Sequence, residues 1–108
     1  MNIEKIYDDK DLTVKVEGRI DTLTSQELEE SLKEDIENIS SLTLDFEALE
    51  YISSAGLRVL ISTQKKLKAN DMQLTIINVN DTIKEIFRMS GFDKILTIRW
   101  DPLNYIPN

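Results

Sequence analysis

Neither cysteine nor histidine occurs in this chain of 108 residues. The lack of cysteine excludes disulfides, thiolate metal sites and cysteine nucleophiles. The lack of histidine excludes Ser-His-Asp catalysis and imidazole metal ligands, and it leaves a carboxylate or a lysine as the only general base. No obvious pair of acids compensates for these losses. We therefore expect a protein that is not an enzyme and that holds no metal ion or other cofactor.

Basic residues are also in short supply. The chain has 13 lysines and arginines against 20 aspartates and glutamates, which gives a formal net charge of −7 and a pI near 4.5. Nucleic acids and anionic lipids both attract basic surfaces, so neither nucleic acid nor a membrane is expected as a partner. The charge suits a protein partner that carries a positive patch.

Long apolar segments and chain breakers are scarce as well. No apolar run approaches the roughly 20 residues that span a bilayer. The N-terminal segment MNIEKIYDDKD lacks the basic start and apolar middle of a signal peptide, so we expect a cytoplasmic protein. With only 3 glycines and 2 prolines, the chain contains no linker, repeat or low-complexity segment. This predicts one domain over residues 1–108, with 99–108 as a short C-terminal tail.

The first third of the chain predicts a hairpin and a helix. Residues 3–9 and 12–20 have the character of strands, and the turn residues DDKD between them predict an antiparallel pair. Thr24 followed by Glu27 has the spacing of a capping box and predicts the start of the helix. The apolar stripe of this helix consists of Leu28, Leu32 and Ile36.

The middle of the chain predicts two buried strands joined by a helix. The strands are residues 41–49 and 72–79, and the helix covers residues 57–70 with Asn70 as its terminator. A helical connection between the two strands predicts that they run parallel with a right-handed crossover. The residues expected on the inner face of the helix are Leu57, Leu60, Ile61 and Leu67.

A short helix and a last strand close the predicted fold. Asn80 is expected to cap the helix and Gly91 to end it, and residues 94–98 form the strand. Ile83, Ile86 and Phe87 are predicted to point inward. The element order β-β-α-β-α-β-α-β indicates the α/β class.

The segment YISSAGLRVL, residues 51–60, places small residues where a core normally has bulky ones. It lies between a predicted strand and a predicted helix, which is where open α/β sheets build their sites. Ser53 or Ser54 can cap the helix, and the sequence alone does not choose between them. Ala55 and Gly56 allow the first helical turn to approach neighbouring backbone closely.

Three interpretations of this segment compete. The first, which local features favour, is a tight and well-capped turn. The second is an exposed serine at the N-terminus of a helix, where the helix dipole and free N–H groups would stabilise an added phosphate. The third, a catalytic serine, is disfavoured because no histidine can activate it and the segment is not a Gly-x-Ser-x-Gly elbow.

Three segments in order resemble the STAS domain, specifically the stand-alone bacterial anti-sigma factor antagonists. LTLDF followed by YISSAGLRVLI is similar to the family's strand, Asp-Ser-Ser/Thr-Gly-Leu motif and helix. VEGRIDTLTSQEL is similar to the segment ahead of its first helix, and VNDTIKEIFRMSGFDKIL is similar to its closing segment. The resemblance implies a single STAS-like domain. Its sheet would be mixed and mostly parallel, with about four to five strands and helices mainly on one face.

The resemblance also assigns residues. The phosphate-accepting serine of the family falls on Ser54, two residues before Gly56. The family's preceding aspartate falls on Ser53, a difference that leaves Ser53 as an alternative site of modification, and its small residue falls on Ala55. Asp21 matches an aspartate near the switch loop and is assigned to partner contact or loop bracing.

The resemblance implies a regulatory partner switch. The unphosphorylated chain would bind an anti-sigma factor, a protein-serine kinase of the histidine-kinase-like ATPase type, and so free the sigma factor. That kinase would phosphorylate Ser54, and a PP2C-type phosphatase would reverse the modification. We expect Arg58 and Val59 at the rim of the partner contact, beside Ser53, Ser54, Ala55, Gly56 and Asp21.

Three other functions remain open at this point. A STAS domain that works without phosphorylation, as a scaffold or ligand-sensing module, is the main alternative. A small-molecule or nucleotide-binding domain is disfavoured because the sequence has no phosphate-cradling glycine loop. An enzyme comes last.

Overall fold

The structure is a computed structural model that describes residues 1–99. Five strands lie side by side in the order β1-β2-β3-β5-β6, and only the first pair is antiparallel. The strands are β1 (Asn2–Asp8), β2 (Asp11–Ile20), β3 (Ser41–Asp45), β5 (Leu74–Ile77) and β6 (Thr97–Arg99). The α/β class and the mixed, mostly parallel sheet are therefore confirmed. Arg99, the first residue of the predicted tail 99–108, is the last residue of β6. Residues 100–108 lie outside the described residues, and the domain limits stay a prediction.

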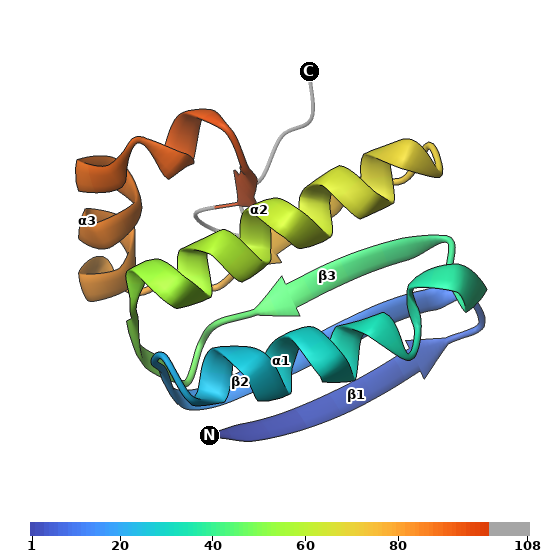
Figure 1. Cartoon of the computed structure of the whole chain (residues 1–108), viewed down its shortest axis with the longest axis horizontal. Coiled ribbons are helices and arrows are strands. Elements are labelled where there is room, and N and C mark those ends of the chain that lie inside the picture. The colour runs from blue at the N-terminus through green and yellow to red at the C-terminus, as the bar shows by residue number, and fades with distance from the viewer. Residues whose placement is uncertain (100–108) are drawn as a thin grey trace.

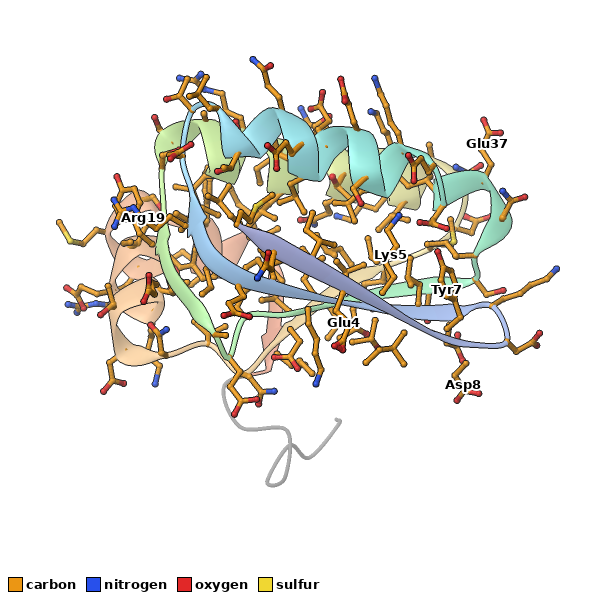
Figure 2. The ribbon with its side chains drawn as sticks, turned by 90° about the horizontal axis from the view of Figure 1, so that it is seen from below. Glu4, Lys5, Tyr7, Asp8, Arg19 and Glu37 are labelled. Carbon is orange, nitrogen blue, oxygen red and sulfur yellow. The ribbon has the colours of Figure 1, made fainter. Side chains whose placement is uncertain are left out.

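Three α-helices accompany the sheet: α1 (Thr24–Lys33), α2 (Ser54–Ala69) and α3 (Asp81–Ser90). Helices α1 and α2 lie side by side over one face of the sheet, and α3 lies at its end beside α2 (Figures 1 and 2). Two short 3-10 helices, η1 (Ile36–Asn38) and η2 (Phe92–Lys94), follow α1 and α3. The opposite face of the sheet is free of helices over the described residues, as Figure 2 shows.

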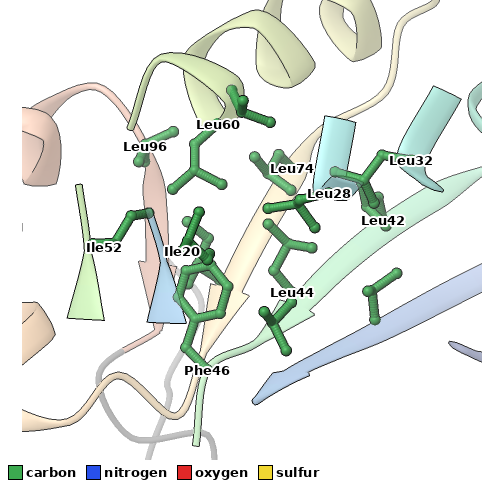
Figure 3. Packing of buried hydrophobic residues seen from close by; sticks show 14 of the residues in the cluster. Ile20, Leu28, Leu32, Leu42, Leu44, Phe46, Ile52, Leu60, Leu74 and Leu96 are labelled. Atoms are coloured by element: carbon green, nitrogen blue, oxygen red, sulfur yellow. The ribbon is translucent and has the colours of Figure 1, made fainter. Parts of the chain in front are cut away.

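The core fills the space between the sheet and the two helices (Figure 3). Alternate residues of β2, β3 and β5 point into it, which is the period expected for strands with one covered face. From the strands these are Leu12, Val14, Val16, Leu42, Leu44, Leu74 and Ile76, all at most 1% exposed. Leu28, Leu32, Leu60 and Leu67 meet them from the helices. The predicted apolar stripes of both helices are thus largely confirmed, except that Ile61 is only partly buried.

The helix ends agree with the sequence at α3. The Asn80 side chain accepts a hydrogen bond from the Ile83 N–H at 2.9 Å, and Gly91 adopts a left-handed conformation with φ of 78°. That conformation costs a glycine little, because it has no Cβ. Both assignments are confirmed.

One predicted strand was wrong. Residues 41–49 do not form a single strand: β3 ends at Asp45, and a separate strand, β4 (Leu49–Ile52), pairs in parallel with the end of β2. The buried Asp45 carboxylate accepts hydrogen bonds from the Glu47 N–H and the Asn78 side chain, both at 3.0 Å. The chain turns away from β3 at these bonds, and the motif at residues 51–60 begins within the last two residues of β4.

The edge strand β1 is tied to the end of α1 and the start of η1 by a charged cluster, of which Lys5 and Tyr7 are labelled in Figure 2. Lys5 donates to the Asp35 carboxylate at 2.6 Å and to the Ser31 carbonyl at 2.8 Å, and the Tyr7 hydroxyl donates to the same carboxylate at 2.7 Å. Burial alone would raise the pKa of Asp35, but the hydrogen bonds from Lys5 and Tyr7 outweigh it and lower the pKa. The cluster therefore stabilises the fold while Asp35 is ionised.

We expect Asp35→Ala to lower the free energy of unfolding by about 1 kcal/mol at pH 7, because the partly buried Lys5 ammonium and the exposed Tyr7 hydroxyl both lose this acceptor. Glu34→Ala is the matched control. Glu34 contacts the same lysine at 3.4 Å with a side chain that is 74% exposed, so its loss should have little effect. Urea denaturation measures both. Equal losses in the two variants would contradict the prediction.

The same cluster predicts a pH dependence. Because the folded-state pKa of Asp35 is lowered, its contribution is present above the unfolded pKa of about 3.9 and is lost as the pH falls through the folded value. The free energy of unfolding should therefore drop less between pH 5 and about pH 2 in Asp35→Ala than in the parent chain.

Candidate functional site

The candidate site forms where β2 and β4 end side by side. Ile20 pairs with Ile52 as the last residues of the two strands, and the Ser53 N–H donates to the Ile20 carbonyl at 2.8 Å. Asp21 therefore leaves one strand next to the point where Ser53 leaves the other. Two segments more than thirty residues apart in sequence meet at the start of α2.

The two serines have different roles at this point. Ser53 is the N-cap of α2: its hydroxyl accepts a hydrogen bond from the Gly56 N–H at 3.2 Å, and its carbonyl accepts one from the Leu57 N–H at 2.9 Å. Ser54 is the first residue of the helix and is exposed. The structure thus decides what the sequence left open: Ser53 caps the helix, and the Ser54 hydroxyl is accessible to another molecule.

The glycine after them is required by packing. A Cβ atom on Gly56 would lie 2.6 Å from Cγ2 of Ile20 and 2.7 Å from Cγ1 of Ile52. Both isoleucines are at most 1% exposed and cannot move aside easily. The first turn of α2 therefore rests directly on the ends of β2 and β4, which fixes the position of Ser54.

Asp21 braces the loop between β2 and α1. Its carboxylate accepts hydrogen bonds from the backbone N–H groups of Thr24 and Leu23 at 2.9 and 3.0 Å, and its own N–H donates to the Thr24 hydroxyl at 2.8 Å. The bonds from Thr24, followed by the one from Leu23, lower the pKa of Asp21 and keep the carboxylate ionised. The predicted capping box of Thr24 with Glu27 is wrong: the reciprocal pair is Asp21 with Thr24, three residues earlier.

The electrostatics at the start of α2 favour an anion. The first turn contains no acidic side chain, and the N-terminal N–H groups of a helix carry partial positive charge. A group added to the Ser54 hydroxyl would extend from this end of the helix.

An aromatic and cationic pair that sequence reasoning missed lies beside the site. The Arg19 guanidinium stacks over the Tyr51 ring at 4.6 Å from its centroid, and the two residues are paired across β2 and β4. Figure 2 shows Arg19 at the end of the molecule where these strands finish. Only the existence of β4 would have revealed this pair, since nothing in the sequence connects the two residues.

Of the residues predicted to bind the partner, Arg58, expected at the rim, is exposed, and Ala55 is half-buried. The placement of Val59 at the rim was wrong, because its side chain is only 6% exposed. Helix α2 contacts α1 as well as β4 and β5, so more of its circumference is covered than one apolar stripe suggests. Gly56 is buried too, so a partner would not contact it directly. It can affect binding only through the position that it gives to the first turn of α2.

Residues 1–99 contain neither a metal-binding cluster of acidic residues nor a membrane-spanning helix. No group of three or more acidic side chains in this part of the chain is arranged to hold a metal ion. None of its helices is both long enough and apolar enough to cross a membrane.

Comparison with known proteins identifies the family. The family model described as the STAS domain matches residues 2–101. The chain belongs to the STAS domain family. The anti-sigma-B factor antagonist of Staphylococcus aureus (strain NCTC 8325 / PS 47) is 34% identical over 101 residues, which cover 91% of this chain and 92% of the relative.

Solved structures show that the fold of this STAS domain is shared with anti-sigma factor antagonists. The antagonist from Mycobacterium paratuberculosis superimposes with a TM-score of 0.81 at 24% identity, covering 94% of this chain and 85% of that one. The Bacillus cell fate determinant SpoIIAA in its phosphorylated form gives a TM-score of 0.71 at 15% identity, covering 92% of both chains. The resemblance read from the sequence is confirmed at the level of the family.

Proposed function

We propose that this STAS domain is an anti-sigma factor antagonist whose binding is switched off by phosphorylation of Ser54. The unphosphorylated form binds an anti-sigma factor, a protein-serine kinase of the histidine-kinase-like ATPase type, and thereby releases the sigma factor. A PP2C-type phosphatase restores the binding form. The proposal sets this exchange in the cytoplasm, where sigma factors act.

The observation that supports this function most strongly is the exposed Ser54 hydroxyl at the start of α2, with Ser53 already engaged as the cap. A kinase can reach Ser54 without unfolding the helix, whereas a phosphate on Ser53 would displace the capping bond to Gly56. The relatedness to an anti-sigma-B factor antagonist and the phosphorylated neighbour are consistent with the same role.

The switch follows from charge and size. A phosphate adds about −1.5 to −2 charges, to a chain with a formal net charge of −7. Within the chain the added anion is stabilised by the N-terminus of α2, so the fold should be retained. At an interface formed around Ser54, the same anion must be desolvated and occupies space, so the complex is weakened.

We expect incubation with an anti-sigma factor kinase from the source bacterium, ATP and Mg²⁺ to add one phosphate, mapped to Ser54 by mass spectrometry. Ser54→Ala should abolish the modification. Ser53→Ala removes the helix cap but leaves the Ser54 hydroxyl that accepts the phosphate, so this variant should still be phosphorylated. Modification of Ser53 in the parent chain, or of neither serine, would contradict the proposal.

A further inference from the structure

An apolar groove with a basic rim lies one helical turn from Ser54. It has a volume of about 780 Å³ and runs between the middle of α2 and the segment around η2. Its apolar lining comes from Ile61, Phe92 and Ile95, and Ile95 is 52% exposed. Exposed apolar groups gathered in a groove indicate an interaction site more often than scattered ones do.

The rim has the opposite charge to the rest of the chain. Arg58, Lys65 and Lys66 border the groove, and no carboxylate of the described residues lines it. Three cations around one groove stand out on a chain with a formal net charge of −7. An occupant that complements both features has an apolar stripe between acidic side chains.

The groove is continuous with the candidate site. Ser54 and Arg58 are four residues apart on α2 and lie on the same side of the helix, and Arg58 borders the groove. A partner that covers Ser54 therefore reaches the groove without crossing another element. The glutamate-rich helix α1 is the part of a second copy that would match the basic rim. A second copy is nevertheless a poor occupant, because the apolar residues of this helix, Leu28 and Leu32, are buried.

We infer that this groove binds an acidic amphipathic helix of the protein partner that docks at Ser54. The inference rests on the proposed function for the identity of that partner, the anti-sigma factor. Apolar residues of the partner helix fill the groove over Ile61, Phe92 and Ile95, and its carboxylates pair with the basic rim. The groove then provides affinity that is separate from the contact at Ser54.

The first test uses a synthetic helical peptide with leucines at i, i+4 and i+7 flanked by glutamates. In a titration of the ¹⁵N-labelled full chain, we expect chemical-shift changes centred on Ile61, Phe92 and Ile95, and affinity that falls with added salt. Lys65→Glu should weaken binding at least about fivefold. Lys68→Glu, an equal charge change at an exposed position of α2 outside the groove, should have less than a twofold effect.

Three results would overturn the inference at this stage. One is equal binding of a control peptide in which every glutamate is replaced by lysine. Another is an absence of shifts in the groove at millimolar peptide. Concentration-dependent dimerisation that Lys65→Glu abolishes would also overturn it, because the groove would then bind a second copy.

The second test uses the anti-sigma factor itself and separates the inference from the proposed function. Lys65→Glu should weaken its binding, with Lys68→Glu as the control and circular dichroism confirming that both variants are folded. If Ser54→Asp abolishes binding while Lys65→Glu has no effect, the groove inference fails and the proposed function stands. If the acidic peptide binds in the groove but the anti-sigma factor binds neither the parent nor Ser54→Ala, the proposed function fails.

Discussion

Ser54→Asp should reduce binding to the anti-sigma factor by at least about tenfold, which corresponds to about 1.4 kcal/mol. The substitution places a permanent negative charge at the first position of α2, where the wild-type hydroxyl is exposed and uncharged. The helix dipole stabilises that charge in the free chain, so the cost appears mainly when the partner must cover it. Isothermal titration calorimetry with the purified partner measures the loss.

Two further variants make this result specific to the Ser54 hydroxyl. Ser54→Ala should bind as tightly as the parent and should remain bound when ATP is added, because it cannot be phosphorylated. Glu50→Gln changes the charge at another exposed position by one unit and should leave binding within about twofold. Parent-like binding by both Ser54→Asp and Ser54→Ala would exclude the phosphorylation switch, even though the family assignment would stand.

Gly56→Ala should lower the free energy of unfolding by about 1–3 kcal/mol, the usual cost of overpacking a core. In an unobstructed helix the same change would stabilise by up to about 1 kcal/mol. Here the added methyl group would lie 2.6 and 2.7 Å from side-chain atoms of Ile20 and Ile52, well inside van der Waals contact. The sign of the measured change therefore tests directly whether α2 packs on the ends of β2 and β4.

Ala55→Ser is the matched control for this substitution. It also adds one heavy atom in the same turn, but at a half-buried position, so its effect should stay within about 0.5 kcal/mol. Urea denaturation gives both values. A stabilised Gly56→Ala would mean that the helix and strands do not approach as closely as the structure indicates. A destabilised variant should also move Ser54 and weaken partner binding.

Local chemistry was enough to predict the parts of the fold that depend on neighbours in sequence. The hairpin, most of the inner faces of the helices and both ends of α3 follow from periodicity, turn residues and caps, and the structure confirms them. Ile61 and Ile86, both predicted to point inward, are only partly buried. The family could also be read from three ordered segments, because their residue types and spacing are specific in combination. The position of Ser54 near the start of a helix could also be predicted from the neighbouring residues in the sequence.

Features that depend on residues distant in sequence were missed or left open. From the sequence, Asp45 looks like one more residue of a strand. In the structure it ends β3, and its carboxylate also accepts a hydrogen bond from Asn78, 33 positions away. The stacking of Arg19 on Tyr51 follows from the separate strand β4. Val59 could not be placed correctly without knowing that α1 packs against α2.

The order of residues alone established an acidic α/β domain of the STAS type with a serine pair where a strand gives way to a helix. Only the folded chain assigned the capping role to Ser53 and left Ser54 exposed, since that choice depends on where the Ile20 carbonyl lies in space. The apolar groove with its basic rim likewise forms only in the folded chain, where side chains of α2 lie beside η2, about thirty residues further on. The spacing of apolar residues in the sequence predicts which residues are buried. Which distant segments lie side by side depends on how the whole chain packs.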